Sequence, residues 1–193
     1  FYIGNLGVSR TNSDRVGIGI LNTLIGGRFT SRLNTALRTD TGLTYGARSA
    51  FDQRKLAGPF LISTYTRTAT TEQAMDMALE LLKTFLVQGI TEEELESAKN
   101  YVKGQFPPSI ETSSQLASTV ARLEFYGLDE GDINAYYEKV DSLTLPEAHR
   151  IIKQYFPMDN LVFVLIGKGS EIETVAGKYV SQIDRKSISD SGF

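Results

Sequence analysis

The sequence predicts an α+β domain with a largely antiparallel sheet and helices packed on one of its faces. Three observations lead to this prediction. Few segments have the β-branched and aromatic composition of strands, two of these are separated only by a short polar loop, and the helical segments are gathered in blocks. The order is strand, helices, two strands, a long helical block, strand, helix. A doubly wound parallel sheet, in which helices alternate with strands, fits this order less well.

The first strand is predicted over residues 1–6, and a helical apolar pattern begins at Asp14. The pattern breaks at Gly26-Gly27 and resumes until Gly42, which predicts two helices or one kinked helix. The glycine pair either bends the helix or admits another backbone.

A central hairpin follows, with strands over 43–52 and 58–67 joined by the polar loop QRKLA. The next helix is predicted from Thr70 to Gly89, because Thr70 and Gln73 have the spacing of a capping box and one apolar stripe runs between these ends.

The second half of the chain contains further helices and one more strand. Thr91 with Glu94 predicts a capped helix that ends at Pro107-Pro108. Two further helices are expected over 112–126 and from Asp132 through Val140. A third is expected from Thr144 to Pro157, because Thr144 and Glu147 have the spacing of a helix cap. The last is expected over 171–183, with Ser170 as its cap. The segment LVFVLIG predicts a buried strand. We expect residues 1–183 to form a single domain, cut from a longer polypeptide, and 184–193 to be a polar, disordered tail.

Composition excludes several classes of partner. The 193 residues include 20 basic and 23 acidic side chains, a net charge of -3, which argues against binding to nucleic acid or to an anionic membrane. No stretch approaches the roughly 20 apolar residues of a membrane span. The compartment, cytoplasmic or periplasmic, stays open because we expect any targeting segment to lie outside this fragment.

The residue types also limit the chemistry. The chain has no cysteine and one histidine, so it offers neither a thiol nucleophile nor the two imidazoles of an HxxEH zinc helix. We therefore expect no metal site and no cofactor in this chain. His149 is expected on a solvated helix face, and the acidic run that begins at Glu92 is expected to complement a helix dipole rather than to hold a cation. The glycines of IGKG lack the rest of a dinucleotide-binding pattern.

The most informative segment is LNTLIGGRFTSRLNTALRTDTGLTYGARS, over 21–49. It resembles the segment LGG-x-x-x-SRL-x-x-x-LRE-x-x-G-x-x-Y of the insulinase/pitrilysin-type (inverzincin) zinc peptidases. The phrases GITEEELESAKNYVKGQF, over 89–106, and DSLTLPEAHRIIKQYFPMDNLVFVLIG, over 141–167, resemble later parts of the same family in the same order. The resemblance covers nearly the whole chain.

This resemblance implies a pitrilysin-like fold and a place in a two-half enzyme. In the family, one half holds zinc through HxxEH and a distal Glu, and the other half lacks these ligands but supplies an Arg and a Tyr to the substrate. Arg38 and Tyr45 match that pair, and the absence of HxxEH makes this chain similar to the non-zinc half. The resemblance thus implies a homologous zinc-bearing partner half, on the same or another polypeptide, a peptide substrate, and no activity for this chain alone.

The residues by themselves leave alternatives open. Arg38 in a last helical turn complements the helix dipole, and Tyr45 alternates with Leu43 and Ala47 as a packed core tyrosine would. A second function is a non-catalytic interaction subunit of the same fold, as in the core subunits of a respiratory complex. A third is an unrelated α+β binding domain.

Overall fold

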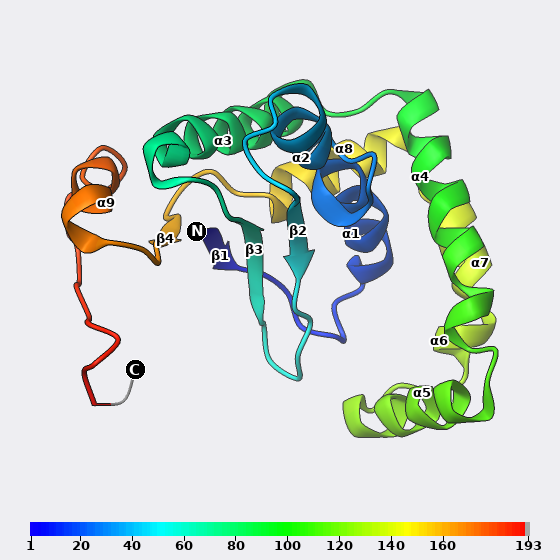
Figure 1. Ribbon diagram of the computed structural model, residues 1–193. Coiled ribbons are helices and arrows are strands. Elements are labelled where there is room, and N and C mark those ends of the chain that lie inside the picture. Colours follow the sequence, from blue (N-terminus) through cyan, green and yellow to red (C-terminus); the bar gives the residue numbers. More distant parts are fainter. Residues whose placement is uncertain (192–193) are drawn as a thin grey trace.

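The computed structural model describes residues 1–191, and within them the α+β prediction is confirmed (Figure 1). One antiparallel sheet has the strand order β2-β3-β1-β4. Its strands are β1 (Tyr2–Leu6), β2 (Ala47–Phe51), β3 (Pro59–Thr64) and β4 (Val162–Val164). The first strand and the central hairpin therefore lie where the sequence predicts them.

The helices also follow the predicted order. They are α1 (Arg15–Asn22), the π-helix η1 (Thr23–Gly27), α2 (Arg32–Asn34), the π-helix η2 (Thr35–Asp40), the 3-10 helix η3 (Thr68–Thr70), α3 (Thr71–Gln88), α4 (Glu92–Gln105), the 3-10 helix η4 (Pro107–Ser109), α5 (Ser113–Tyr126), α6 (Gly131–Asn134), α7 (Tyr136–Asp141), α8 (Leu145–Tyr155) and α9 (Gly169–Ala176). No helix of residues 1–191 has the length and apolar character that crossing a bilayer would require.

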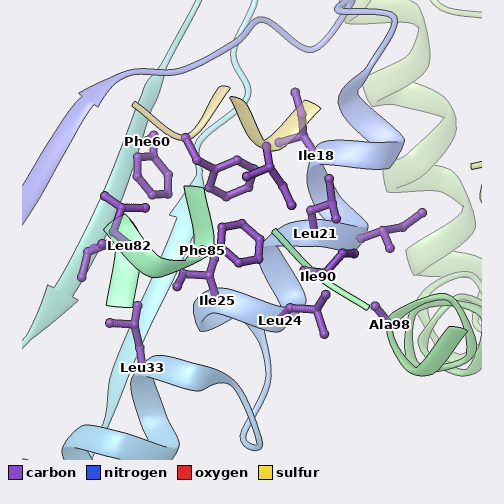
Figure 2. Close-up of a cluster of buried hydrophobic side chains, with 14 of the residues drawn as sticks. Ile18, Leu21, Leu24, Ile25, Leu33, Phe60, Leu82, Phe85, Ile90 and Ala98 are labelled. Carbon is purple, nitrogen blue, oxygen red and sulfur yellow. The ribbon is translucent and has the colours of Figure 1, made fainter. Parts of the chain in front are cut away.

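The core lies between one face of the sheet and the helices that cover it. Alternate side chains of the strands, Ile3 on β1 with Phe60 and Ile62 on β3, are fully buried. Figure 2 shows Phe60 beside Leu82 and Phe85 of α3, with the apolar side chains of α1 and η1 next to them. The helices are thus fixed to the sheet by their apolar stripes.

The outer face of the sheet is open, and here one prediction is wrong. The segment predicted as a buried strand becomes β4, an edge strand that pairs with β1 and exposes Val162 and Val164. An apolar run alone does not distinguish a central strand from an edge strand. On the inner face, Phe163 stacks on Tyr179 from the segment after α9, with ring centroids 5.6 Å apart.

The predicted helix caps have different outcomes. Thr91 and Glu94 form the predicted capping box. Thr70, Thr144 and Ser170 do not cap their helices through their side chains. The Thr70 hydroxyl bonds the carbonyl of Arg67 in the preceding 3-10 turn, the carboxylate of Glu147 pairs with Arg150 instead of reaching back, and α9 begins one residue earlier than Ser170.

The middle part of the helical block, from α4 to α6, forms an arm. In Figure 1, α4 descends at the right of the view to α5, which lies apart from the sheet. The last helix ends at Ala176, earlier than predicted. Residues 184–191 of the predicted tail are exposed and contain no helix or strand, and residues 192–193 lie outside the described part of the chain.

Candidate functional site

The structure brings Arg38 and Tyr45 together. The guanidinium carbon of Arg38, in the last turn of η2, lies 4.5 Å from the ring centroid of Tyr45, in the loop before β2. The same carbon lies 4.8 Å from the ring centroid of Phe29. Both aromatic rings therefore contact one guanidinium, an arrangement that stabilises the cation through the ring quadrupoles.

This cluster of Phe29, Arg38 and Tyr45 lies on the surface. Tyr45 is 73% exposed and Phe29 is 63% exposed, so the interpretation of Tyr45 as a core residue is wrong. The alternation on which it rested holds only inside a strand, and β2 begins at Ala47, after Tyr45. Within residues 1–191, neither the guanidinium nor the phenol has a side-chain hydrogen bond or ion pair, so their donors face solvent.

Asn34 fixes the chain on both sides of the cluster. Its side-chain amide donates to the carbonyl of Phe29 at 2.7 Å, and its side-chain oxygen accepts from the backbone N–H of Ala47 at 3.2 Å. Asn34 is buried, where an unpaired backbone donor or acceptor would be costly. One side chain thus holds the segments that present Phe29 and Tyr45 against the helix that presents Arg38.

Threonine hydroxyls hold the loop that contains Tyr45. The Thr64 hydroxyl on β3 donates to Thr44 at 3.0 Å and lies 2.9 Å from the carbonyl oxygen of Gly46. The Thr66 hydroxyl donates to the carbonyl of Leu43 at 2.8 Å. Tyr45 is therefore exposed on a loop whose backbone is hydrogen-bonded on one side to Thr64, at the end of β3, and on the other to Thr66, just beyond it.

The glycine pair in η1 lets β2 approach this helix. A Cβ on Gly26 would lie 2.2 Å from the backbone nitrogen of Ser49, so only glycine fits there without a shift. Asn22 strengthens the contact, since its side chain donates to the carbonyl of Ser49 at 3.0 Å and accepts from the Ser49 hydroxyl at 2.6 Å. Of the two roles that the sequence allowed, Gly26 has the second, the admission of another backbone.

The segment after the glycines is anchored to α4. Arg32 donates to Glu94 at 2.7 Å and to the carbonyl of Gly89 at 3.2 Å. Burial alone would raise the pKa of Glu94, but the hydrogen bonds from Arg32 and from the Thr91 N–H outweigh it and lower the pKa. Glu94 therefore closes the capping box that the sequence predicts and also binds Arg32.

His149 is not on a solvated face, contrary to the prediction. Its Nε2 lies 2.9 Å from the carbonyl oxygen of Ile90, and the ring packs against Gly89, which has a φ of +71°. The imidazole is thus a packing residue between α8 and the turn after α3. Residues 1–191 contain no group of three or more His, Asp or Glu side chains placed to hold a metal ion.

The sequence alone does not indicate that Phe29 and Asn34 belong to this site. Phe29 is an aromatic residue in a polar stretch, and Asn34 is a polar residue beside the apolar Leu33, so each breaks its local pattern. Their partners, however, come from other segments, and only the tertiary structure shows them.

Comparison with known proteins shows the family and a similar fold. The family model described as "Peptidase M16 inactive domain" matches residues 1–102, which include Arg38 and Tyr45. The chain is 27% identical over 149 residues to the Helicobacter pylori protein named "Non-peptidase homolog YmxG", covering 76% of this chain and 34% of that protein. It is 25% identical over 151 residues to the Bacillus subtilis "Uncharacterized zinc protease YmxG", covering 78% and 37%.

A solved structure of a peptidase M16 inactive domain from Pseudomonas fluorescens has a similar fold. It matches with a TM-score of 0.77 and 25% identity, over 83% of this chain and 38% of that chain. The present chain spans about a third of the length of the two curated relatives, with 34% and 37% of their residues covered.

Proposed function

The chain belongs to the family of the peptidase M16 inactive domain, and we propose that it is the substrate-binding, metal-free half of a two-half zinc peptidase. The resemblance to insulinase/pitrilysin-type peptidases is thereby confirmed. In the proposal, residues 1–183 form one domain that acts with a homologous HxxEH-bearing half, on the same or a separate polypeptide, upon a peptide substrate.

Zinc does not fit the donor set of this chain. Its one histidine bonds the backbone of Ile90, it has no cysteine, and residues 1–191 hold no cluster of three metal-ligating side chains. In the proposal the partner half supplies the zinc and the activated water that attacks the peptide carbonyl.

The observation that supports the proposal is the exposed pair of Arg38 and Tyr45. Negative charge grows on the carbonyl oxygen as a peptide bond is attacked, and donors aimed at that oxygen lower the barrier. The guanidinium of Arg38 contacts the two rings, and its N–H groups are not used by other side chains of residues 1–191. We infer that Arg38 donates to the substrate as a fixed cation and Tyr45 as a neutral O–H donor.

The test is a peptide-hydrolysis assay of this chain combined with the HxxEH half. Arg38→Ala and Tyr45→Phe are each expected to lower kcat/KM by about 10²- to 10³-fold, as loss of one donor to a developing oxyanion does. The exposed residues Arg48 and Tyr65 provide matched controls, and Arg48→Ala and Tyr65→Phe should leave the rate within twofold or so of the wild type. Full activity in the Arg38 and Tyr45 variants would exclude their proposed roles.

A second candidate function is a non-catalytic interaction subunit of the same fold. It is favoured by the name of the Helicobacter pylori relative, a non-peptidase homolog. The two functions differ in the partner half: HxxEH with a downstream Glu supports the peptidase, and a partner half without these ligands supports the interaction subunit.

A further inference from the structure

A cavity far along β2 from Tyr45 contains an excess of positive charge. Its volume is about 460 Å³, and it lies between the start of α1, the end of β2 and the helical arm of α4 to α6. In Figure 1, α5 and α6 of this arm lie at the lower right of the molecule. The charged residues that line it are Arg10, Arg15, Arg122 and Asp132, three cations against one anion.

The one carboxylate is already shared. Asp132 forms an ion pair with Arg15, and both side chains are only 10% exposed. Its oxygens also lie 3.6 Å from a nitrogen of Arg10 and 3.4 Å from the amine of Lys139. Asp132 therefore has three cations around it and cannot neutralise the charge of the cavity.

Arg122 adds a further positive charge from α5. Its guanidinium donates to the Thr119 hydroxyl at 3.1 Å, and no carboxylate of residues 1–191 forms an ion pair with it. The pKa of Arg10 is lowered mainly by burial and also by the nearby charge of Arg122. The pKa of Arg15 is likewise lowered mainly by burial and also by the charge of Arg10. The cations thus destabilise one another, and an added anion would relieve this repulsion.

We propose that this cavity is a binding site for a small oxyanion, a phosphate or a carboxylate, held by Arg10, Arg15 and Arg122. Guanidinium groups bind the oxygens of both anions through charge-assisted hydrogen bonds. The uncharged donors of Gln53 and Gln105 line the same cavity, and Phe106, stacked on Tyr136 at 4.3 Å, gives it an apolar wall. The site is separate from the Arg38 cluster and does not depend on the proposed peptidase function.

The test is isothermal titration of the purified chain with inorganic phosphate, at an ionic strength kept constant with chloride. A short acetylated peptide with a free terminal carboxylate, compared with its amide, tests the second source of the anion. Binding of phosphate in preference to chloride, or of the peptide carboxylate in preference to the amide, supports the site. The anion that binds more tightly shows whether the natural ligand is a phosphate or a carboxylate. No binding beyond that of chloride and the amide would overturn the proposal.

Variants locate the binding. Arg122→Gln and Arg10→Gln are each expected to weaken the affinity by about tenfold or more, since a charge-assisted hydrogen bond is lost. Arg122→Gln breaks no ion pair within residues 1–191, so the fold should persist, and circular dichroism checks this. Arg48→Gln, on the outer face of the sheet, is the matched control with unchanged affinity. Equal affinity in Arg122→Gln, Arg10→Gln and wild type would place the anion elsewhere and contradict the proposal.

Discussion

At the scale of single residues, the guanidinium of Arg38 contacts two ring faces, and no carboxylate of residues 1–191 forms an ion pair with it. Its carbon lies 4.5 Å and 4.8 Å from the ring centroids of Tyr45 and Phe29. An ion pair would occupy the N–H groups of the guanidinium, whereas contact with aromatic faces orients the cation and leaves these donors available. Phe29 and Tyr45 together therefore orient Arg38.

The geometry of Asn34 predicts a large loss of stability on truncation. Asn34→Ala leaves the N–H of Ala47 and the carbonyl of Phe29 without their partner, so the free energy of unfolding should fall by about 2 to 4 kcal/mol. Denaturant titration measures this change. Thr35→Ala, at an exposed position of the same helical segment, should cost no more than about 0.5 kcal/mol. Equal losses in both variants would mean that Asn34 does not fix the two segments.

Two glycines near α1 should respond in opposite directions to alanine. Gly26→Ala places a Cβ 2.2 Å from the backbone of Ser49, and we expect a loss of about 3 kcal/mol or failure to fold. A Cβ on Gly19, within α1, meets nothing within 4 Å, so Gly19→Ala should raise stability by about 0.5 to 1 kcal/mol. Thermal unfolding of the two variants compares them directly, and a stable Gly26→Ala protein would disprove the close approach of β2.

At the scale of elements, the two helix N-termini at Thr91 and Thr144 should differ in how much their threonines contribute to stability. Thr91→Ala removes a capping box at α4 and should cost about 1 kcal/mol. Thr144→Ala, at the start of α8, removes a side chain that makes no capping bond and should cost about 0.5 kcal/mol or less. Urea titration of both variants gives the comparison, and the reverse order would contradict the assigned caps.

The contact of Glu94 with Arg32 predicts how stability depends on pH. The pKa of Glu94 is lower in the folded protein than its ordinary value of 4.5, so folding is favoured above that value and the gain is lost as the pH falls through the folded pKa. Glu94→Gln should therefore flatten the decline of stability below about pH 4.5. Glu92→Gln, an exposed neighbour in the same helical turn, should retain the wild-type decline in acid titrations followed by circular dichroism. Identical curves for both variants would rule out the role of the pair.

Helices and strands could largely be predicted from the sequence because their signals are local. Gly42 and Gly89 adopt positive φ where the sequence predicts the ends of their helical patterns, and Gly127 does the same after α5. Capping boxes were less predictable, because Thr91 and Thr144 are each followed three residues later by a glutamate. Glu94 bonds back to the Thr91 N–H, whereas Glu147 bonds Arg150 on the next helical turn. The exposure of β4 depends on which strands become neighbours, and no local pattern contains that information.

At the scale of the whole molecule, the family resemblance predicted the pair Arg38 and Tyr45, and the fold explains why they meet. The close approach of β2 to η1 at Gly26 places the loop before β2 next to η2. Phe29 and Asn34 were not predictable, because their partners lie in different segments of the chain. The outer face of the sheet, with Tyr2 and Leu6 exposed, adds an open apolar surface to the domain.

The central claim is that Arg38 and Tyr45 act together on one substrate oxygen, and a double-mutant cycle on the assembled two-half enzyme tests it most directly. The cycle measures kcat/KM for peptide hydrolysis with Arg38→Ala, Tyr45→Phe and both changes. Because the two groups touch and, in the proposal, serve one oxygen, the combined loss should be clearly smaller than the product of the single losses. Single variants as active as the wild type, or losses that multiply fully as for independent sites, would contradict the account.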